Sequence, residues 1–207
     1  MTGLSPRQII NASNEIDNDE DLGFYSDRIA FYNSSSTLNT AEGNDSITGI
    51  VSQNIDYFFE HYGIANDYEG RIDTGTGNDI ITGIIQAGIY GDGIYNGIDS
   101  IDTGDGNDLI TGISQTGDGI VNQRGTIDTG DGQDTITGLG LSLGILLEEG
   151  SALDTGKGND TITGIASYCG IRNYSPTFNT NDGDDIITGN KALLSLWYKI
   201  DQPIQLG

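Results

Sequence analysis

One phrase of 13 residues occurs six times in this chain and constrains its fold more than any other feature. A clear copy reads Ile101-Asp-Thr-Gly-Asp-Gly-Asn-Asp-Leu-Ile-Thr-Gly-Ile113. The six copies span residues 38–50, 72–84, 101–113, 127–139, 153–165 and 178–190. Their third residues follow one another at steps of 34, 29, 26, 26 and 25. A repeat of this length cannot bury its apolar face alone, so it predicts a solenoid in which each unit is one coil.

Four aliphatic columns accompany the phrase, and they indicate an all-β fold. They comprise the opener (Ile72, Ile101, Ile127), the first isoleucine after the acidic turn (Ile81, Ile110, Ile136), the residue after Thr-Gly (Ile84, Ile113, Leu139) and a Gly-Ile anchor between phrases (Ile64, Ile94, Ile120, Ile145, Ile171). We expect all four columns to point inward and to stack coil on coil. The sequence therefore predicts a right-handed parallel β-helix with about six coils and about three short strands per coil.

The phrase also divides the chain into three parts. Residues 36–190 are expected to form the β-helix of six repeats. Residues 1–35 are expected to form an N-terminal cap with an incomplete first coil and a short helix that starts at Ser5-Pro6. Residues 191–207 contain the apolar stretch 192–198 and are expected to cap the last coil, because an exposed coil end invites aggregation.

The charge of the chain limits its partners. It has 31 acidic and 8 basic residues among 207, with a formal net charge of −23. Phosphate groups would be repelled, so nucleic acid is excluded as a natural partner, and anionic membranes are disfavoured. No run has the length of a transmembrane helix. Cys169 is the single cysteine, which excludes an internal disulfide and a cysteine-based metal site.

Each phrase places one aspartate at the same position of a glycine-containing turn. These aspartates are Asp45, Asp79, Asp108, Asp134, Asp160 and Asp185. Stacked like charges need a cation between them. Ca²⁺ takes six to eight hard oxygens from carboxylates and backbone carbonyls, and a Gly-x-Gly-x-Asp turn stacked on its copy offers both. The alternative is an aspartate that caps the turn without metal.

The turn resembles the nonapeptide Gly-Gly-x-Gly-x-Asp-x-apolar-x of the repeats-in-toxin (RTX, hemolysin-type) calcium-binding family. Its second and fourth glycines correspond to Gly75 and Gly77, Gly104 and Gly106, Gly130 and Gly132, and Gly156 and Gly158. The resemblance implies calcium ions between successive turns, held by the aspartate carboxylates and glycine-segment carbonyls. With one nonapeptide per coil, it implies a single row of up to about five sites.

This chain departs from the family pattern in two ways. Threonine replaces the first glycine throughout, and Ala41 and Asn181 replace the second glycine in the outer copies. The resemblance also implies an extracellular or cell-surface location. Residues 1–15 lack the apolar segment of an N-terminal signal peptide, and export through an uncleaved C-terminal signal stays open.

A second acidic column precedes each turn and has two interpretations. Its members are Asp73, Asp102, Asp128 and Asp154, with Asn39 and Asn179 at its ends. These side chains could supply extra calcium ligands. They could equally face solvent and hydrogen-bond to turn amides.

Three function classes follow from these features. The first is a calcium-stabilised structural or interaction module. The second is a polysaccharide-acting β-helix enzyme, although the basic residues are scattered and no catalytic constellation is recognisable. The third is a surface binder for ice or a glycan, which would use the threonine column Thr48, Thr82, Thr111, Thr137, Thr163 and Thr188. A second threonine column, from Thr40 to Thr180, is expected to face inward. An aromatic insertion offers a further contact for a glycan or a protein, through Tyr57, Phe58, Phe59, His61 and Tyr62.

Overall fold

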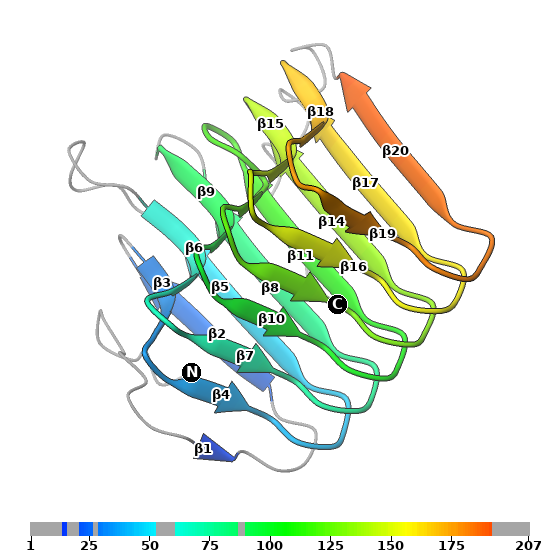
Figure 1. Ribbon diagram of the computed structural model, residues 1–207. Helices are drawn as coiled ribbons and strands as arrows, with labels where there is room; N and C mark the ends of the chain where they lie inside the picture. The colour runs from blue at the N-terminus through cyan, green and yellow to red at the C-terminus, as the bar shows by residue number, and fades with distance from the viewer. Residues whose placement is uncertain (1–13, 16–20, 27–28, 53–60, 87–89, 192–207) are drawn as a thin grey trace.

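The computed structural model of the chain describes residues 14–15, 21–26, 29–52, 61–86 and 90–191, which form three parallel sheets (Figure 1). The opener sheet has seven strands, β1 (Asn14–Glu15), β4 (Thr37–Asn39), β7 (Arg71–Asp73), β10 (Ser100–Asp102), β13 (Thr126–Asp128), β16 (Ala152–Asp154) and β19 (Thr177–Asn179). The threonine sheet has seven, β2 (Asp21–Ser26), β5 (Ser46–Val51), β8 (Ile80–Ile85), β11 (Leu109–Ser114), β14 (Thr135–Gly140), β17 (Thr161–Ala166) and β20 (Ile186–Lys191). The anchor sheet has six, β3 (Ile29–Ser34), β6 (His61–Asp67), β9 (Gly91–Asn96), β12 (Ile120–Asn122), β15 (Leu143–Leu147) and β18 (Cys169–Asn173).

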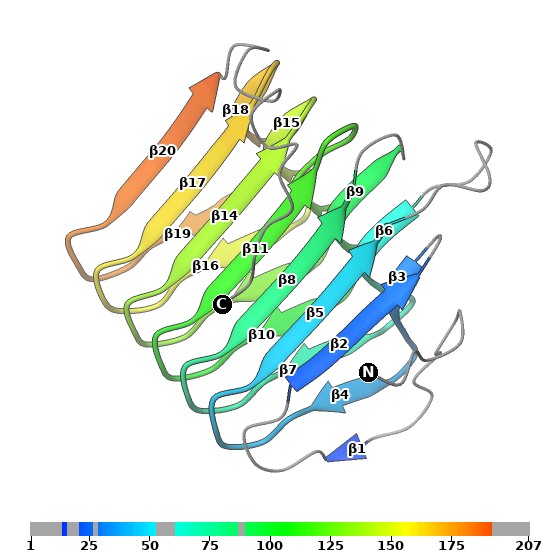
Figure 2. The same ribbon diagram turned by 180° about the vertical axis from the view of Figure 1, so that it is seen from behind.

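Each coil contributes one strand to each sheet, so the chain is a parallel β-helix, as the sequence predicted (Figures 1 and 2). The strand register aligns every repeat with its copy. Ile72 pairs with Ile101 in the opener sheet, and Ile81 pairs with Ile110 in the threonine sheet. Before the first phrase, β1, β2 and β3 already add one strand to each sheet. The expected helix at residues 5–10 and the apolar stretch 192–198 lie outside the described residues.

Three of the four predicted aliphatic columns form the core. The openers, the isoleucines after the turn and the anchor isoleucines from coil to coil are almost fully buried, and Ile72, Ile81 and Ile94 are each 0% exposed. Ile171, in the last coil, is only partly buried.

The prediction for the fourth column was wrong. Ile84, Ile113 and Leu139 are only half-buried and face outward from the threonine sheet. Ile81 and Ile84 are three residues apart on one continuous strand, so they must lie on opposite faces.

The inward position between them is occupied by Gly83. A Cβ atom built there would lie 2.1 Å from the carbonyl oxygen of Gly93 in the anchor sheet. Gly112, Gly138 and Gly164 repeat this close approach with the glycines of the next anchors, at 2.1–2.2 Å. The glycines of Thr-Gly and Gly-Ile therefore let the two sheets meet backbone to backbone, and this meeting fixes which isoleucines enter the core.

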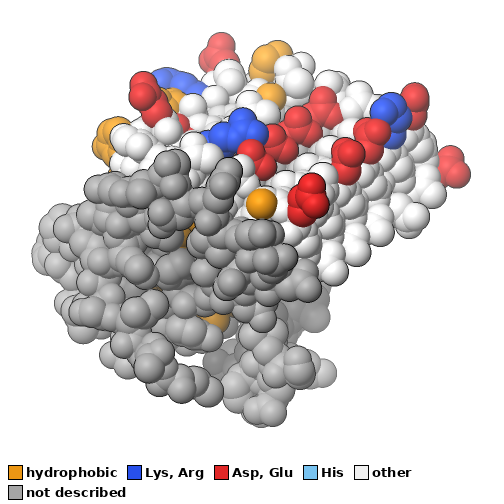
Figure 3. Space-filling model, turned by 90° about the horizontal axis from the view of Figure 1, so that it is seen from below, with side chains coloured by type: hydrophobic (Ala, Val, Ile, Leu, Met, Phe, Trp, Pro, Cys, Tyr) orange, Lys and Arg blue, Asp and Glu red, His pale blue; other side chains and the backbone are white. Residues whose placement is uncertain are grey.

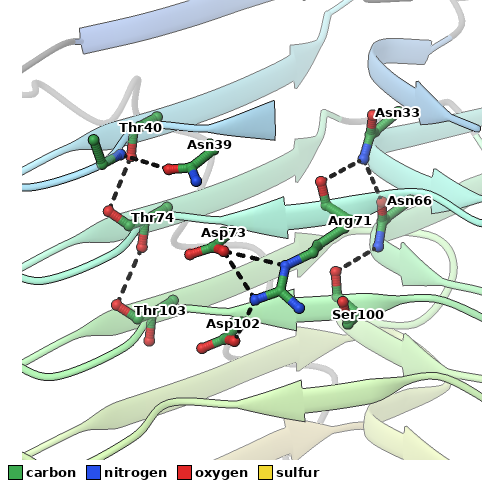
Figure 4. Close-up of polar contacts among 11 residues, drawn as sticks. Asn33, Asn39, Thr40, Asn66, Arg71, Asp73, Thr74, Ser100, Asp102 and Thr103 are labelled. Atoms are coloured by element: carbon green, nitrogen blue, oxygen red, sulfur yellow. Dashed lines mark hydrogen bonds and ion pairs between the residues drawn. The ribbon is translucent and has the colours of Figure 1, made fainter. Parts of the chain in front are cut away.

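A buried asparagine ladder inside the coil was not predicted. Asn33, Asn66, Asn96 and Asn122 are each 0% exposed. The side-chain amides of Asn33, Asn66 and Asn96 each donate to the Oδ1 atom of the next asparagine along the ladder, at 2.8–2.9 Å. Figure 4 shows the first of these bonds, from Asn33 to Asn66. The same amides donate to opener-sheet carbonyls, as Asn66 does to Ser100 at 3.0 Å. The ladder thus ties the anchor sheet to the opener sheet. Its sequence signal is an asparagine two residues after the anchor.

Candidate functional site

The acidic turn links the opener sheet to the threonine sheet. The residue at the second glycine position of the nonapeptide pattern requires a left-handed backbone. The φ angle is +77° at Gly104 and +75° at Gly130. A Cβ atom on Gly104 would also lie 1.6 Å from the carbonyl oxygen of Gly75 in the preceding coil. The two outer copies keep this conformation without glycine, since φ is +70° at Ala41 and +49° at Asn181. The turn is therefore regular from one end of the solenoid to the other.

The predicted aspartate column lies on the inner side of this turn. Asp45, Asp79, Asp108, Asp134 and Asp160 are at most 2% exposed, and Asp185 in the last coil is half-buried. From Asp79 onward, each Oδ1 atom accepts a hydrogen bond from the backbone N–H of the aspartate one coil earlier. The five N···O distances are 2.8–2.9 Å. The column is consequently a continuous hydrogen-bonded ladder along the solenoid axis.

The residues before these aspartates form a second ladder that runs in the opposite direction, from Asn44 to Gln133 and again from Asn159 to Asp184. The Oδ1 atom of Asn78 accepts the N–H of Asn107, and the Oδ1 atom of Asn107 accepts the N–H of Gln133, both at 2.8 Å. The N–H of Gly106 donates to the carbonyl of Asp131 in the next coil, at 3.0 Å. Side chains and carbonyls therefore satisfy the amides on both sides of the turn.

Two rows of oxygen atoms are left without donors. The Oδ2 atoms of Asp79, Asp108, Asp134 and Asp160 are buried and accept no hydrogen bond within the described structure. The carbonyl oxygens of Gly75, Gly77, Gly104 and Gly106 also accept none from the described residues. A Cβ atom on Gly106 would lie 1.5 Å from the carbonyl oxygen of Gly77 and 3.4 Å from Oδ1 of Asp108. The carbonyl row thus runs beside the aspartate ladder.

The buried carboxylates are held in a setting that disfavours their charge. Burial raises the pKa of Asp108 to about 7 and that of Asp134 to about 6. The backbone N–H that donates to each of these carboxylates offsets this effect only in part. The pKa of Asp79 also lies above its usual range, again mainly because of burial. The inner threonine column is buried as predicted from Thr40 to Thr155. Figure 4 shows its members Thr40, Thr74 and Thr103 in successive coils.

Among the described residues, the basic side chains that form ion pairs contact other acids. Arg71 contacts Asp73 at 2.8 Å and Asp102 at 2.9 Å, and Lys157 contacts Asp131 at 2.6 Å. All of these carboxylates lie outside the buried ladder. Within the described ranges, no ion pair reaches the buried aspartates, and so their charge has no cationic side chain to balance it.

The second acidic column lies on the outer side of the opener sheet and hydrogen-bonds to turn amides. Asp128 accepts the N–H of Gly130 at 3.1 Å, and Asp154 accepts the N–H of Gly156 at 3.0 Å. Figure 3 shows acidic side chains in rows along this face. Of the two interpretations left open by the sequence, the geometry favours solvated turn caps, and Figure 4 shows Arg71 bridging Asp73 and Asp102.

The aromatic insertion is only partly described. Tyr57, Phe58 and Phe59 lie outside the described residues. His61 is 1% exposed, and its Nδ1 atom lies 3.0 Å from the carbonyl oxygen of Tyr90. Tyr62 is half-buried and stacks at a tilt on Tyr95, with 4.9 Å between ring centroids. Of this predicted contact surface, the described part therefore presents Tyr62 but not His61.

Among the residues described, no three or more His, Cys, Asp or Glu side chains converge as a metal cluster. A cation at the turn would therefore need backbone oxygens in addition to aspartates. None of the described residues forms a helix that is long and apolar enough to cross a membrane. No family model, curated protein or solved structure matches the chain.

Proposed function

We propose that this chain is a calcium-stabilised β-solenoid, an RTX-like structural or interaction module that acts outside the cell or at its surface. The observation that carries the proposal is the row of buried Oδ2 atoms without donors at Asp79, Asp108, Asp134 and Asp160. A buried carboxylate without a balancing positive charge costs several kcal/mol, and stacking such groups adds mutual repulsion. A row of cations would remove both costs.

The donor set fits calcium. Carboxylate and carbonyl oxygens are the ligands that Ca²⁺ prefers, and it accepts six to eight of them in flexible geometry. The inner aspartates would supply the carboxylates, and the turn glycines, such as Gly77 and Gly106, would supply carbonyl oxygens. When bound, the ion supplies positive charge that holds neighbouring coils together. The outer aspartates are not needed for this role, because they already cap turn amides.

Calcium binding would couple to folding, because the two rows of oxygens are brought together only when coils stack. At a free concentration 100 times its Kd, one ion stabilises the folded state by about 2.7 kcal/mol. For a domain of this size, that corresponds to a rise in Tm of about 5–10 °C per ion.

The test is thermal unfolding followed by circular dichroism, with calcium or with excess chelator, alongside a calorimetric titration that counts bound ions. We expect a Tm at least 10 °C higher with calcium. Asp134→Asn should reduce this gain, and in chelator it should melt above the parent protein at pH 8 because it removes a buried charge. Asp128→Asn, in the outer column, is the matched control and should keep the full gain. An unchanged Tm in chelator, with no heat of binding, would overturn the proposal.

A further inference from the structure

Six strands of the threonine sheet, β5, β8, β11, β14, β17 and β20, lie side by side (Figure 2). Their register aligns the outward positions in three straight columns. The middle column is the predicted threonine row, Thr48, Thr82, Thr111, Thr137, Thr163 and Thr188. The columns on either side are Ser46, Ile80, Leu109, Thr135, Thr161 and Ile186, and Ile50, Ile84, Ile113, Leu139, Ile165 and Asn190. All of these side chains are half-exposed or exposed except Ile50, at 7%.

The outward positions of these six strands carry no charged residue, although the chain has a net charge of −23. The seventh strand of the sheet, β2, begins with Asp21, which is in register with Ser46. The contrast with the opener sheet is direct. There, the outward positions of β7, β10 and β13 include Arg71, Asp73, Asp102 and Asp128. Exposed strand positions elsewhere on this solenoid therefore accept charge, whereas the outward positions of these six strands carry none. A partner for this face should be electrically neutral, because neutral surfaces complement neutral surfaces.

The hydroxyl groups of the middle threonine column are free to bind a partner. In the part of the chain that the structure describes, no hydroxyl from Thr48 to Thr188 in this column bonds to another protein group, in contrast with the buried Thr40, whose hydroxyl donates to the Thr74 carbonyl at 3.1 Å. A hydroxyl without a protein partner hydrogen-bonds to water, and a fixed array of hydroxyls holds its first-shell water in a fixed pattern. Each hydroxyl is bordered by aliphatic side chains such as Ile84 and Ile113.

The columns are straight because the strand register never shifts between β5 and β20. Strands in a sheet lie about 4.8 Å apart, and alternate residues lie about 6.7 Å apart along a strand. The face is thus a two-dimensional lattice of hydroxyl and methyl groups. Its partner should be flat, neutral and repeated in two dimensions.

We propose that this face adsorbs to ice. A crystal of water is neutral, flat and periodic, and it is built of hydrogen-bonding groups that the threonine array can match. A second copy of the chain is a weaker fit. The face measures about 450 Å² from strand spacings, whereas a stable dimer buries about 800 Å² per partner. A sugar surface is also a weaker fit, because the outward positions of these six strands carry no aromatic ring, the side-chain type that dominates contact energy. This proposal does not rest on calcium binding.

The test measures thermal hysteresis and partition of the full chain into slowly growing ice, in calcium-containing buffer. Thr137→Lys places charge and bulk in the middle of the array. Thr126→Lys is the matched control, because Thr126 is an exposed outward threonine of the opener sheet. We expect hysteresis and ice partition for the parent protein and for T126K. We expect T137K to fall to the level of buffer while its circular dichroism spectrum and Tm stay unchanged.

Three outcomes would overturn the proposal. The first is absence of hysteresis and of ice partition in the parent protein at millimolar concentration. The second is a parent protein that does not partition into ice but is retained on crystalline cellulose or chitin, or dimerises in sedimentation, when T137K abolishes that retention or dimerisation. The third is a change in the fluorescence of Trp197 in T137K, since the chain has a single tryptophan and its emission would report that residues 192–207 occupy this face.

Discussion

Asp128 and Asp134 lie six residues apart in one phrase, on opposite sides of one turn, and their surroundings differ completely. Asp134 is 1% exposed and accepts the N–H of Asp108 in the preceding coil, at 2.9 Å. Asp128 lies on the outer face and accepts the N–H of Gly130 in its own coil, at 3.1 Å. The inner column links coils, whereas the outer column shapes individual turns. Two acidic residues that repeat with the same period therefore have different structural roles. The side of the turn on which the side chain lies determines whether it links two coils or caps one turn.

The prediction with the largest expected effect tests this difference by truncating one aspartate of each column to alanine. In calcium, Asp134→Ala removes the acceptor for a buried backbone N–H, and we expect a loss of about 3 kcal/mol in the free energy of unfolding. Asp128→Ala leaves the backbone N–H of Gly130 accessible to water. We therefore expect the free energy of unfolding to change by no more than about 0.5 kcal/mol. Urea unfolding of both variants provides the measurement. Equal losses would mean that the two columns are energetically alike.

The second prediction concerns the pH dependence of Tm in the calcium-free protein, to which the inner aspartates should contribute and the outer aspartates should not. The pKa of Asp108 is raised to about 7 and that of Asp134 to about 6, from 3.8. Between about pH 4 and pH 7 the unfolded carboxyls lose protons that the folded ones keep, so stability falls as the pH rises through this window. We therefore expect a higher Tm at pH 5.5 than at pH 8 in chelator.

The variants from the calcium test serve as controls for this profile. Asp134→Asn should flatten the pH dependence, because it removes one of the titrating groups. Asp128→Asn should leave the profile intact. A calcium-free Tm that falls steadily on acidification would show that the inner carboxylates are ionised in the folded protein.

The smallest effect concerns the ends of the ladder. Ala41 has a φ of +70°, a conformation that is strained for residues other than glycine. Ala41→Gly should stabilise the protein by about 0.5 kcal/mol, since relief of strain exceeds the added freedom of the unfolded chain. Asn181→Gly is the comparison. Asparagine tolerates this conformation, and the Asn181 side chain donates to Asp154, so we expect a loss instead. Differential scanning calorimetry can resolve both shifts.

Much of the fold follows from the phrase. The stacking of coils, the inward openers and anchors and the inner threonine column were all predicted, because identical residues at a fixed period can bury themselves only against their copies. The left-handed turn could also be anticipated, since glycine occupies its first position in four copies. The asparagine ladder also carried a periodic signal, two residues after the anchors Ile64, Ile94 and Ile120, and could have been found in the same way.

Other features depended on the sheets meeting in space. The sequence determined that Ile81 and Ile84 belong to one apolar motif, but only the approach of Gly83 to Gly93 decided that Ile81 enters the core and Ile84 faces out. The sequence likewise determined one aspartate per turn. The tertiary structure decided that it points inward, because its carboxylate must reach the backbone N–H of the preceding coil. Periodicity specifies which residues stack, and contacts between sheets and coils specify whether each side chain faces the core or the solvent.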